Sequence, residues 1–199
     1  MSSRSAHKVL ALLLLLPFLG WISTGLVFLF KPGYEQAYEY LHVKTYRVDT
    51  EQVLQVPPGW DEVRHLRTVL GDHLLLRQGN TWSHLRAESL DRWPRPSPAD
   101  ITRLLNDAAG QKSDRYGEVS GNRDGVFTTT TGVELTLDWQ TLAITQRGRD
   151  TRLIGTLYRV HYLEWFGQPV ADRVLGVVAL TALALLVVLG VKLLARESE

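Results

Sequence analysis

The sequence contains no cysteine among its 199 residues, which excludes a disulfide framework, a thiolate metal site and a cysteine nucleophile. It also has almost no net charge, because 22 basic residues nearly balance 21 acidic ones to give +1. This balance gives no support for a basic nucleic-acid-binding surface, so no nucleic-acid partner is expected. The sequence also lacks G-x-S-x-G and H-E-x-x-H motifs and a phosphate-cradling glycine loop, which argues against a hydrolase.

Charge is also missing from two long apolar runs. Residues 9–30 read VLALLLLLPFLGWISTGLVFLF, and residues 174–191 read VLGVVALTALALLVVLGV. About 20 apolar residues in a helix cross roughly 30 Å of hydrocarbon, so we predict transmembrane helices over 9–30 and 172–193. A cleaved signal peptide is the alternative for the first run. That run is longer than a typical signal-peptide core and continues to Lys31 without a convincing small-residue cleavage site.

Basic residues lie outside both runs: Arg4 and Lys8 precede the first, and Lys192 and Arg196 follow the second. The positive-inside rule therefore predicts a cytoplasmic N-terminus (1–8) and a cytoplasmic C-terminus (194–199). The central region, 31–171, is then on the opposite side. In a bacterium the protein would be a two-pass inner-membrane protein with a periplasmic domain.

The first part of the central region shows strand and helix signals. Alternating residues predict strands over 45–50, 73–78 and 79–87, with the last two forming a hairpin. Ser97 as N-cap and Pro98 as the first helical residue predict a helix that stops at Gly110. The proline-rich segment RWPRPSP (92–98) is expected to join two parts of the domain.

The second part continues the same mixture. Residues 125–139 predict a hairpin around Gly132, followed by a turn from Asp138 to Thr141 and a strand through Ile144. Residues 151–166 predict an interfacial helix before the second span. The expected fold is α+β, with two transmembrane helices flanking a domain of antiparallel strands and short helices.

Three stretches resemble the PepSY-associated transmembrane family. SAHKVLALLLLLPFLGWISTGLVFLFKP is similar to the family's first helix, and LDWQTLAITQRGRDTRLIGTLYRVHYLEWFG to the end of a PepSY-like domain with the histidine that follows it. VLGVVALTALALLVVLGVKLL resembles the next helix. Larger relatives carry four spans, and some are b-haem ferric or ferric-siderophore reductases. This sequence has two spans, and His7 and His161 match the family's membrane-proximal histidines.

The histidines have two interpretations. His161 lies on the apolar side of the helix expected over 151–166, so it needs either a hydrogen-bond partner, such as a backbone carbonyl or Tyr40, or a metal. The first interpretation makes it an anchor, and the second makes it an axial ligand of haem b. His7 either extends to the cytoplasmic interface or binds haem. The two lie at opposite membrane faces, so a bis-histidine site requires an oligomer, a partner subunit or His42.

Other residues complete the predicted set. Tyr162, Trp165 and Phe166 are expected in an aromatic belt, and Trp21 is a further membrane anchor. Gly20-x-x-x-Thr24 is a spacing that would allow dimerisation. Asp138 and Thr141 are candidate partner contacts beyond their role in the turn. Three further histidines, His65, His73 and His84, are expected to be exposed or at strand edges and not to bind metal.

The sequence therefore predicts an accessory or binding protein of the inner membrane. We expect it to support iron-related or other redox-linked membrane processes. We expect the protein to lie in the lipid bilayer. It would assemble as a homodimer or as part of a larger membrane complex. Catalysis by this chain alone is not expected. If it has an activity, it would be a haem-dependent ferric reductase component. The third hypothesis is a periplasmic module that modulates a peptidase through an exposed sheet edge.

Overall fold

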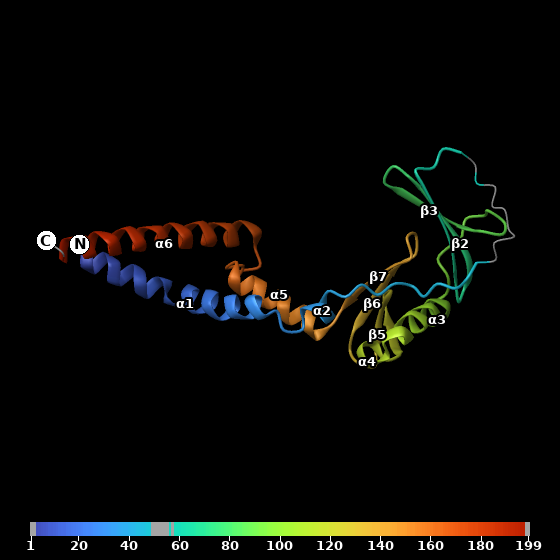
Figure 1. Cartoon of the computed structure of the whole chain (residues 1–199), viewed down its shortest axis with the longest axis horizontal. Coiled ribbons are helices and arrows are strands. Elements are labelled where there is room, and N and C mark those ends of the chain that lie inside the picture. Colours follow the sequence, from blue (N-terminus) through green and yellow to red (C-terminus); the bar gives the residue numbers. More distant parts are fainter. Residues whose placement is uncertain (1–2, 49–55, 57, 198–199) are drawn as a thin grey trace. The chain divides into compact units, whose positions relative to one another are not determined.

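The computed structural model describes residues 3–48, 56 and 58–197. It is an α+β structure with an apolar helix near each terminus and two antiparallel sheets. The chain divides into two units (Figure 1). Unit 1 consists of residues 1–34 and 150–199, and unit 2 of residues 35–149. Each is described by itself.

Unit 1 contains three helices, which are α1 (Ser3–Phe30), α5 (Arg149–His161) and α6 (Pro169–Glu197). The helices α1 and α6 pack against each other, with Leu14, Leu163 and Ala179 buried between them. Most of their remaining surface is apolar and exposed, and both are long and apolar enough to cross a membrane. A helix that is apolar on all sides is the pattern of a membrane span.

The predicted interfacial helix over 151–166 is too long, because α5 ends at His161. Leu163 has a left-handed backbone, with φ of 59°. Its N–H donates to the Val160 carbonyl, and the Glu164 N–H donates to the Arg159 carbonyl, which is the hydrogen-bond pattern of a Schellman cap. Such a cap usually takes glycine. Here a leucine occupies the position, and its side chain is buried with Leu14 and Ala179.

Unit 2 begins with a three-stranded sheet of order β1-β2-β3. Its strands are β1 (Glu62–Thr68), β2 (Gly71–Gln78) and β3 (Thr81–Arg86). The hairpin expected from residues 73–87 is confirmed. The central strand β2 is buried on both faces: Leu75 joins the main core, whereas Leu74 and Leu76 pack in a smaller cluster with Ala87. No strand forms over residues 45–48, and residues 49–50 lie outside the described part of the chain.

The segment around Tyr46 is attached mainly through side chains. Tyr46 makes a single backbone bridge to Arg67, and its hydroxyl donates to Asp107 at 2.7 Å. Lys44 approaches the same carboxylate at 3.4 Å. These contacts hold the segment against a helix, which explains why the alternating sequence does not extend the sheet.

A four-stranded sheet follows, of order β4-β5-β6-β7, with strands β4 (Val119–Arg123), β5 (Val126–Thr129), β6 (Glu134–Asp138) and β7 (Ala143–Arg147). Helix α3 (Pro98–Ala109) packs against it through Ile101, Leu104 and Leu105. The Ser97 hydroxyl accepts the Asp100 N–H, so the predicted N-cap is confirmed. Short helices α2 (Tyr34–Ala37), η1 (Gly110–Lys112) and α4 (Ser113–Tyr116) complete the structure.

Candidate functional site

His161, the last residue of α5, is fixed against α1 by two hydrogen bonds. The Trp21 Nε1–H donates to the His161 carbonyl at 2.7 Å, and the Thr24 hydroxyl lies 2.8 Å from His161 Nδ1. The ring also meets Phe28 edge to face, with centroids 5.1 Å apart. The polar partner expected for His161 therefore exists, but it is Thr24 and not Tyr40. Tyr40 belongs to unit 2, where its ring stacks on His42.

The direction of the Thr24 bond determines the state of the imidazole. The Thr24 hydroxyl donates its one proton to the Gly20 carbonyl at 2.6 Å. It must then accept from His161, so Nδ1 carries the proton and Nε2 keeps a free lone pair. Nε2 makes no hydrogen bond to any residue that the structure describes. This tautomer leaves Nε2 as a possible ligand or acceptor.

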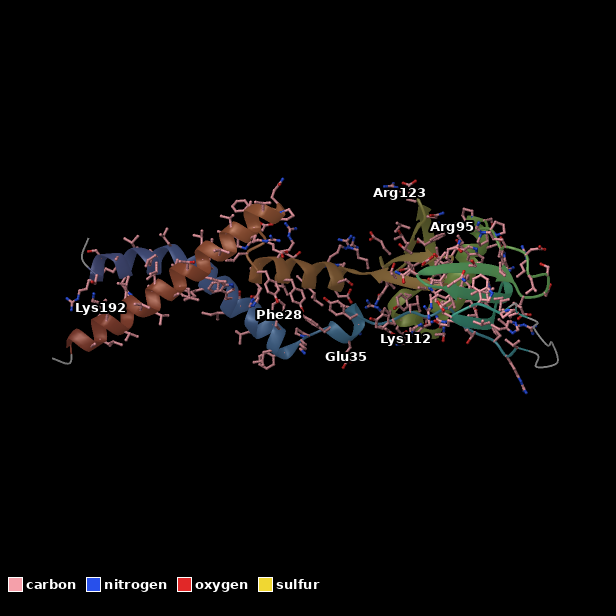
Figure 2. The ribbon with its side chains drawn as sticks, turned by 90° about the horizontal axis from the view of Figure 1, so that it is seen from above. Phe28, Glu35, Arg95, Lys112, Arg123 and Lys192 are labelled. Carbon is pink, nitrogen blue, oxygen red and sulfur yellow. The ribbon has the colours of Figure 1, made fainter. Side chains whose placement is uncertain are left out.

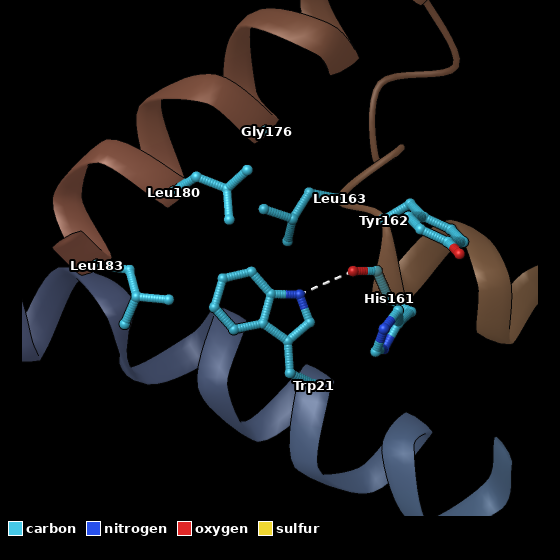
Figure 3. Close-up of a pocket in the computed structure, with 7 residues that line it drawn as sticks. All are labelled: Trp21, His161, Tyr162, Leu163, Gly176, Leu180 and Leu183. Atoms are coloured by element: carbon cyan, nitrogen blue, oxygen red, sulfur yellow. Dashed lines mark hydrogen bonds between the residues drawn. The ribbon is translucent and has the colours of Figure 1, made fainter. Parts of the chain in front are cut away.

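An apolar pocket of about 490 Å³ adjoins His161 (Figure 3). Its walls come from all three helices of unit 1: Trp21, His161, Tyr162, Leu163, Gly176, Leu180 and Leu183. Figure 3 shows the indole of Trp21 between the leucines of α6 and the end of α5. The pocket thus combines an apolar lining with one imidazole at its edge, an arrangement suited to an apolar ligand that needs a single polar contact.

The predicted dimerisation motif is used within the chain. A Cβ placed on Gly20 would lie 3.4 Å from Val160 of α5, and Thr24 binds His161. The small residues at these two positions allow α5 to approach α1 closely. Gly20-x-x-x-Thr24 therefore has an intramolecular role, and a homodimer stays a prediction.

On α1, His7 lies far from the residues that contact His161. The contacts of His161 on α1 begin at Trp21, 14 residues after His7, so roughly 20 Å of helix separates the two histidines. The His7 ring packs near Gly190 of α6, and its Nδ1 is buried with no partner among the described residues. Its extension to the cytoplasmic interface stays a prediction. The two histidines of one chain do not reach a common iron.

The remaining predicted residues are placed as follows. His42 lies in unit 2 and forms a backbone bridge to Ala143, so its role as an outer ligand stays a prediction. Tyr162 and Phe166 are well exposed and Trp165 is less so, and an aromatic belt stays a prediction.

The turn from Asp138 to Thr141 is confirmed. One Asp138 oxygen accepts the Gln140 N–H at 2.9 Å, and the other accepts the Thr141 hydroxyl at 2.8 Å. Both carboxylate oxygens therefore stabilise the turn. A partner contact at Asp138 and Thr141 stays a prediction.

His73 and His84 were predicted to be exposed or at strand edges, and this was wrong. Both are completely buried in unit 2, where His73 Nδ1 lies 2.8 Å from His84 Nε2. His73 and His84 lie on neighbouring paired strands, β2 and β3, whose sequences also carry polar residues. Only the packing of β2 between two apolar clusters shows that these positions lie in the core.

The hydrogen bonds around this pair form a chain with one direction. His84 Nδ1 donates to the Trp139 carbonyl at 2.6 Å, since a carbonyl only accepts. His84 Nε2 must then accept from His73 Nδ1–H. The Thr68 hydroxyl completes the chain by donating to His73 Nε2 at 2.7 Å, while it accepts the Leu70 N–H. Every polar atom of the two rings is satisfied when both are neutral.

Two tryptophans enclose the pair. The His73 ring stacks on Trp93 at 4.4 Å between centroids, and the His84 ring lies 4.3 Å from the Trp139 ring. The Trp139 Nε1–H donates to the Trp93 carbonyl at 2.9 Å. Burial lowers the pKa of His73 to about 3, with the neighbouring His84 acting in the same direction. Burial also lowers the pKa of His84. The sequence offered no pattern for this cluster beyond the two histidines themselves.

No known protein family, curated protein or solved structure matches the chain. The resemblance to PepSY-associated transmembrane proteins therefore remains a prediction from the sequence. Among the described residues, no group of three or more histidine, aspartate or glutamate side chains is arranged to hold a metal ion.

Proposed function

We propose that the protein is a two-pass membrane protein in which α5 fixes the chain against the spans, and in which unit 2 is a PepSY-like accessory or binding domain. Both termini would be cytoplasmic and unit 2 would lie outside the inner membrane. The observation that carries the proposal is the docking of α5 on α1. Its His161 bonds to Thr24 and Trp21 beside two helices that expose apolar side chains along their length.

The anchoring role follows from the energetics of a buried polar group. An imidazole on an apolar helix face costs free energy unless its N–H is bonded, and Thr24 supplies that bond. The stacked rings of Phe28 and Tyr158, 4.7 Å apart, add an apolar contact between the same two helices. Together these contacts connect the end of the α+β part of the sequence to the first span. A role in iron-related or other redox-linked membrane processes remains part of this proposal.

The membrane topology can be tested with single cysteines, since the sequence has none of its own. Ser89→Cys places a thiol on the exposed surface of unit 2, and Ser3→Cys places one at the start of α1. In intact cells, a membrane-impermeant maleimide should label Ser89→Cys, whereas Ser3→Cys should react only after the cells are lysed. Equal labelling of both in intact cells would contradict the topology, and the parent chain without cysteine is the control for background.

A second function, as a b-haem electron-transfer or ferric reductase subunit, is favoured by the tautomer of His161. Nδ1–H is bonded and Nε2 is free beside an apolar pocket, which suits one axial nitrogen. Bound haem would supply one-electron chemistry. Since His7 cannot reach the same iron, a second axial ligand must come from elsewhere.

Visible spectra of protein purified in mild detergent from haem-replete cells would decide between the two functions. A reduced b-type α-band that is lost in His161→Ala would support ligation. His42→Ala is a matched histidine variant in unit 2, and loss of the band in both would indicate that His42 is the second ligand. A colourless wild-type protein would exclude the haem role and leave His161 as an anchor. The peptidase-modulating hypothesis has no specific contact in its favour.

A further inference from the structure

Unit 2 contains a polar pocket of about 290 Å³ between the end of β3, the proline-rich segment and α3. Arg86 of β3, Arg95 of the proline-rich segment and Arg103 of α3 all line it. Trp93 lines it as well, and 7% of this residue is exposed. Three guanidinium groups from separate parts of the chain therefore border one cavity. All of these residues belong to unit 2. One of them, Arg95, is labelled in Figure 2.

Among the described residues, these arginines have no acidic ion-pair partner. Across the described residues, the ion pairs involve other basic side chains, and none includes Arg86, Arg95 or Arg103. Like charges that share a cavity repel one another, and a bound anion would remove that cost. The pocket thus has a charge that the described chain does not neutralise.

Neighbouring groups contact two of the three arginines, Arg86 and Arg103, while leaving most of their donors free. The Arg86 guanidinium lies 4.4 Å from the centre of the Trp93 ring. Arg103 uses one nitrogen to donate to the Val69 carbonyl at 3.3 Å, and each guanidinium has five N–H groups. Trp93 is itself fixed, because its N–H donates to the His84 carbonyl at 2.8 Å. Arg86, Arg103 and Trp93 are therefore partly ordered before any ligand arrives, which lowers the cost of binding.

The charge balance indicates the class of ligand. Three guanidinium groups and the Asp100 carboxylate line the cavity, which gives a net charge of +2. Asp100 is also engaged locally, since its Oδ2 accepts the Ser97 hydroxyl at 2.7 Å. Guanidinium groups bind phosphate oxygens in pairs with matching geometry. A phosphate dianion satisfies both the charge and the donors.

We propose that this pocket binds the phosphate group of a small phosphorylated molecule or of a lipid headgroup. Arg86, Arg95 and Arg103 donate to the phosphate oxygens, and Asp100 limits the affinity by repulsion. The proposal gives a ligand class to the binding role of unit 2. It rests on the proposed function only in treating that unit as a binding domain.

The test is calorimetric titration of inorganic phosphate, in chloride buffer, into the full chain held in phosphatidylcholine nanodiscs. The wild type should bind one phosphate, and Arg86→Gln or Arg103→Gln should weaken binding about ten-fold or more, since each removes a charged hydrogen-bond donor. Arg147→Gln is the matched control, because Arg147 is an exposed arginine of β7 that lines none of the described pockets.

Asp100→Asn gives a result of the opposite sign. It removes the repelling charge and should tighten phosphate binding several-fold, a gain that misfolding would not produce. Absence of phosphate binding by the wild type, or an equal loss in Arg147→Gln, would overturn the proposal. Neither result would alter the cysteine-labelling pattern. The proposed membrane topology and the proposed phosphate site are therefore tested independently.

Nanodiscs that contain phosphatidic acid distinguish the two sources of phosphate. If a lipid headgroup occupies the pocket, these discs should weaken the binding of free phosphate to the wild type. With a soluble ligand, the affinity should be the same in both kinds of disc. An anionic-lipid effect that persists unchanged in Arg86→Gln would show that lipid acts elsewhere and would overturn the lipid source.

Discussion

Mild acid should destabilise unit 2 because His73 and His84 are buried as neutral imidazoles. In the unfolded chain each would take up a proton near its ordinary pKa of 6.5, whereas burial lowers the pKa of His73 to about 3. Between these values the unfolded state binds more protons than the folded state. Stability is therefore complete above pH 6.5 and decreases as the pH falls toward 3.

The size of the effect follows from proton linkage. Lowering the pH from 7 to 5 should cost about 2 kcal/mol of unfolding free energy through His73 alone, and His84 contributes in the same direction. This is a large part of the ~5 to 15 kcal/mol that stabilises a typical domain. Burial is the main cause of the cost at His73. At His84, burial acts in the same way, and a second proton would also place two N–H groups against each other.

Urea unfolding of the full chain in non-ionic detergent, followed by tryptophan fluorescence, measures this loss. The urea midpoint should fall between pH 7 and pH 5, and His73→Gln should reduce that dependence while lowering stability at pH 7. His65→Gln is the matched control, because His65 lies on β1 of the same sheet and is only half-buried. A His73 imidazole NMR signal that titrates near pH 6.5 in the folded protein would refute the reasoning.

Three further substitutions test individual contacts by thermal unfolding of the full chain in detergent. Thr24→Val should cost about 1 to 3 kcal/mol by leaving the imidazole at the end of α5 without an acceptor, whereas Ser23→Ala, whose hydroxyl bonds its own helix, should cost little. A similar loss in both would contradict the assigned bond. Gly117→Ala should destabilise by more than ~1 kcal/mol, because φ is +60° and a Cβ would collide with a threonine hydroxyl. Gly121→Ala is the control, because a Cβ at Gly121 would have no atom within 4 Å. Leu163→Gly should be less damaging than Leu163→Ala, by about 1 kcal/mol, since only glycine relieves the left-handed backbone. The reverse order would show that the cap carries no strain.

Several elements could be predicted because their signals are local. Ser97 and Pro98 marked the start of α3, and the glycine turn near Gly132 marked the hairpin of β5 and β6. Strands β1 and β4 were not predicted, although each pairs with the strand that follows it. Both lie at sheet edges, and both are largely polar. Their pairing is therefore decided by a neighbouring strand and not by a strong pattern of their own.

For the candidate functional residues too, the sequence predicted some properties but not the contacts. The apolar face of α5 indicated that His161 needs a partner, but Thr24 is 137 residues away in the sequence. Likewise, Trp139 is 55 residues from His84. A buried imidazole requires hydrogen bonds wherever it lies, and only packing decides which groups provide them.

The sequence by itself determined the two long apolar helices, the α+β composition and the capped helix α3, because these depend on periodicity and on neighbouring residues. The tertiary structure decided that Gly20 and Thr24 receive α5, that His73 and His84 form a neutral buried pair, and that arginines from three different elements border one pocket. These features depend on contacts between separate secondary-structure elements, whether close or distant in the sequence. Local propensity carries no information about such contacts, and they exist only once the core has packed.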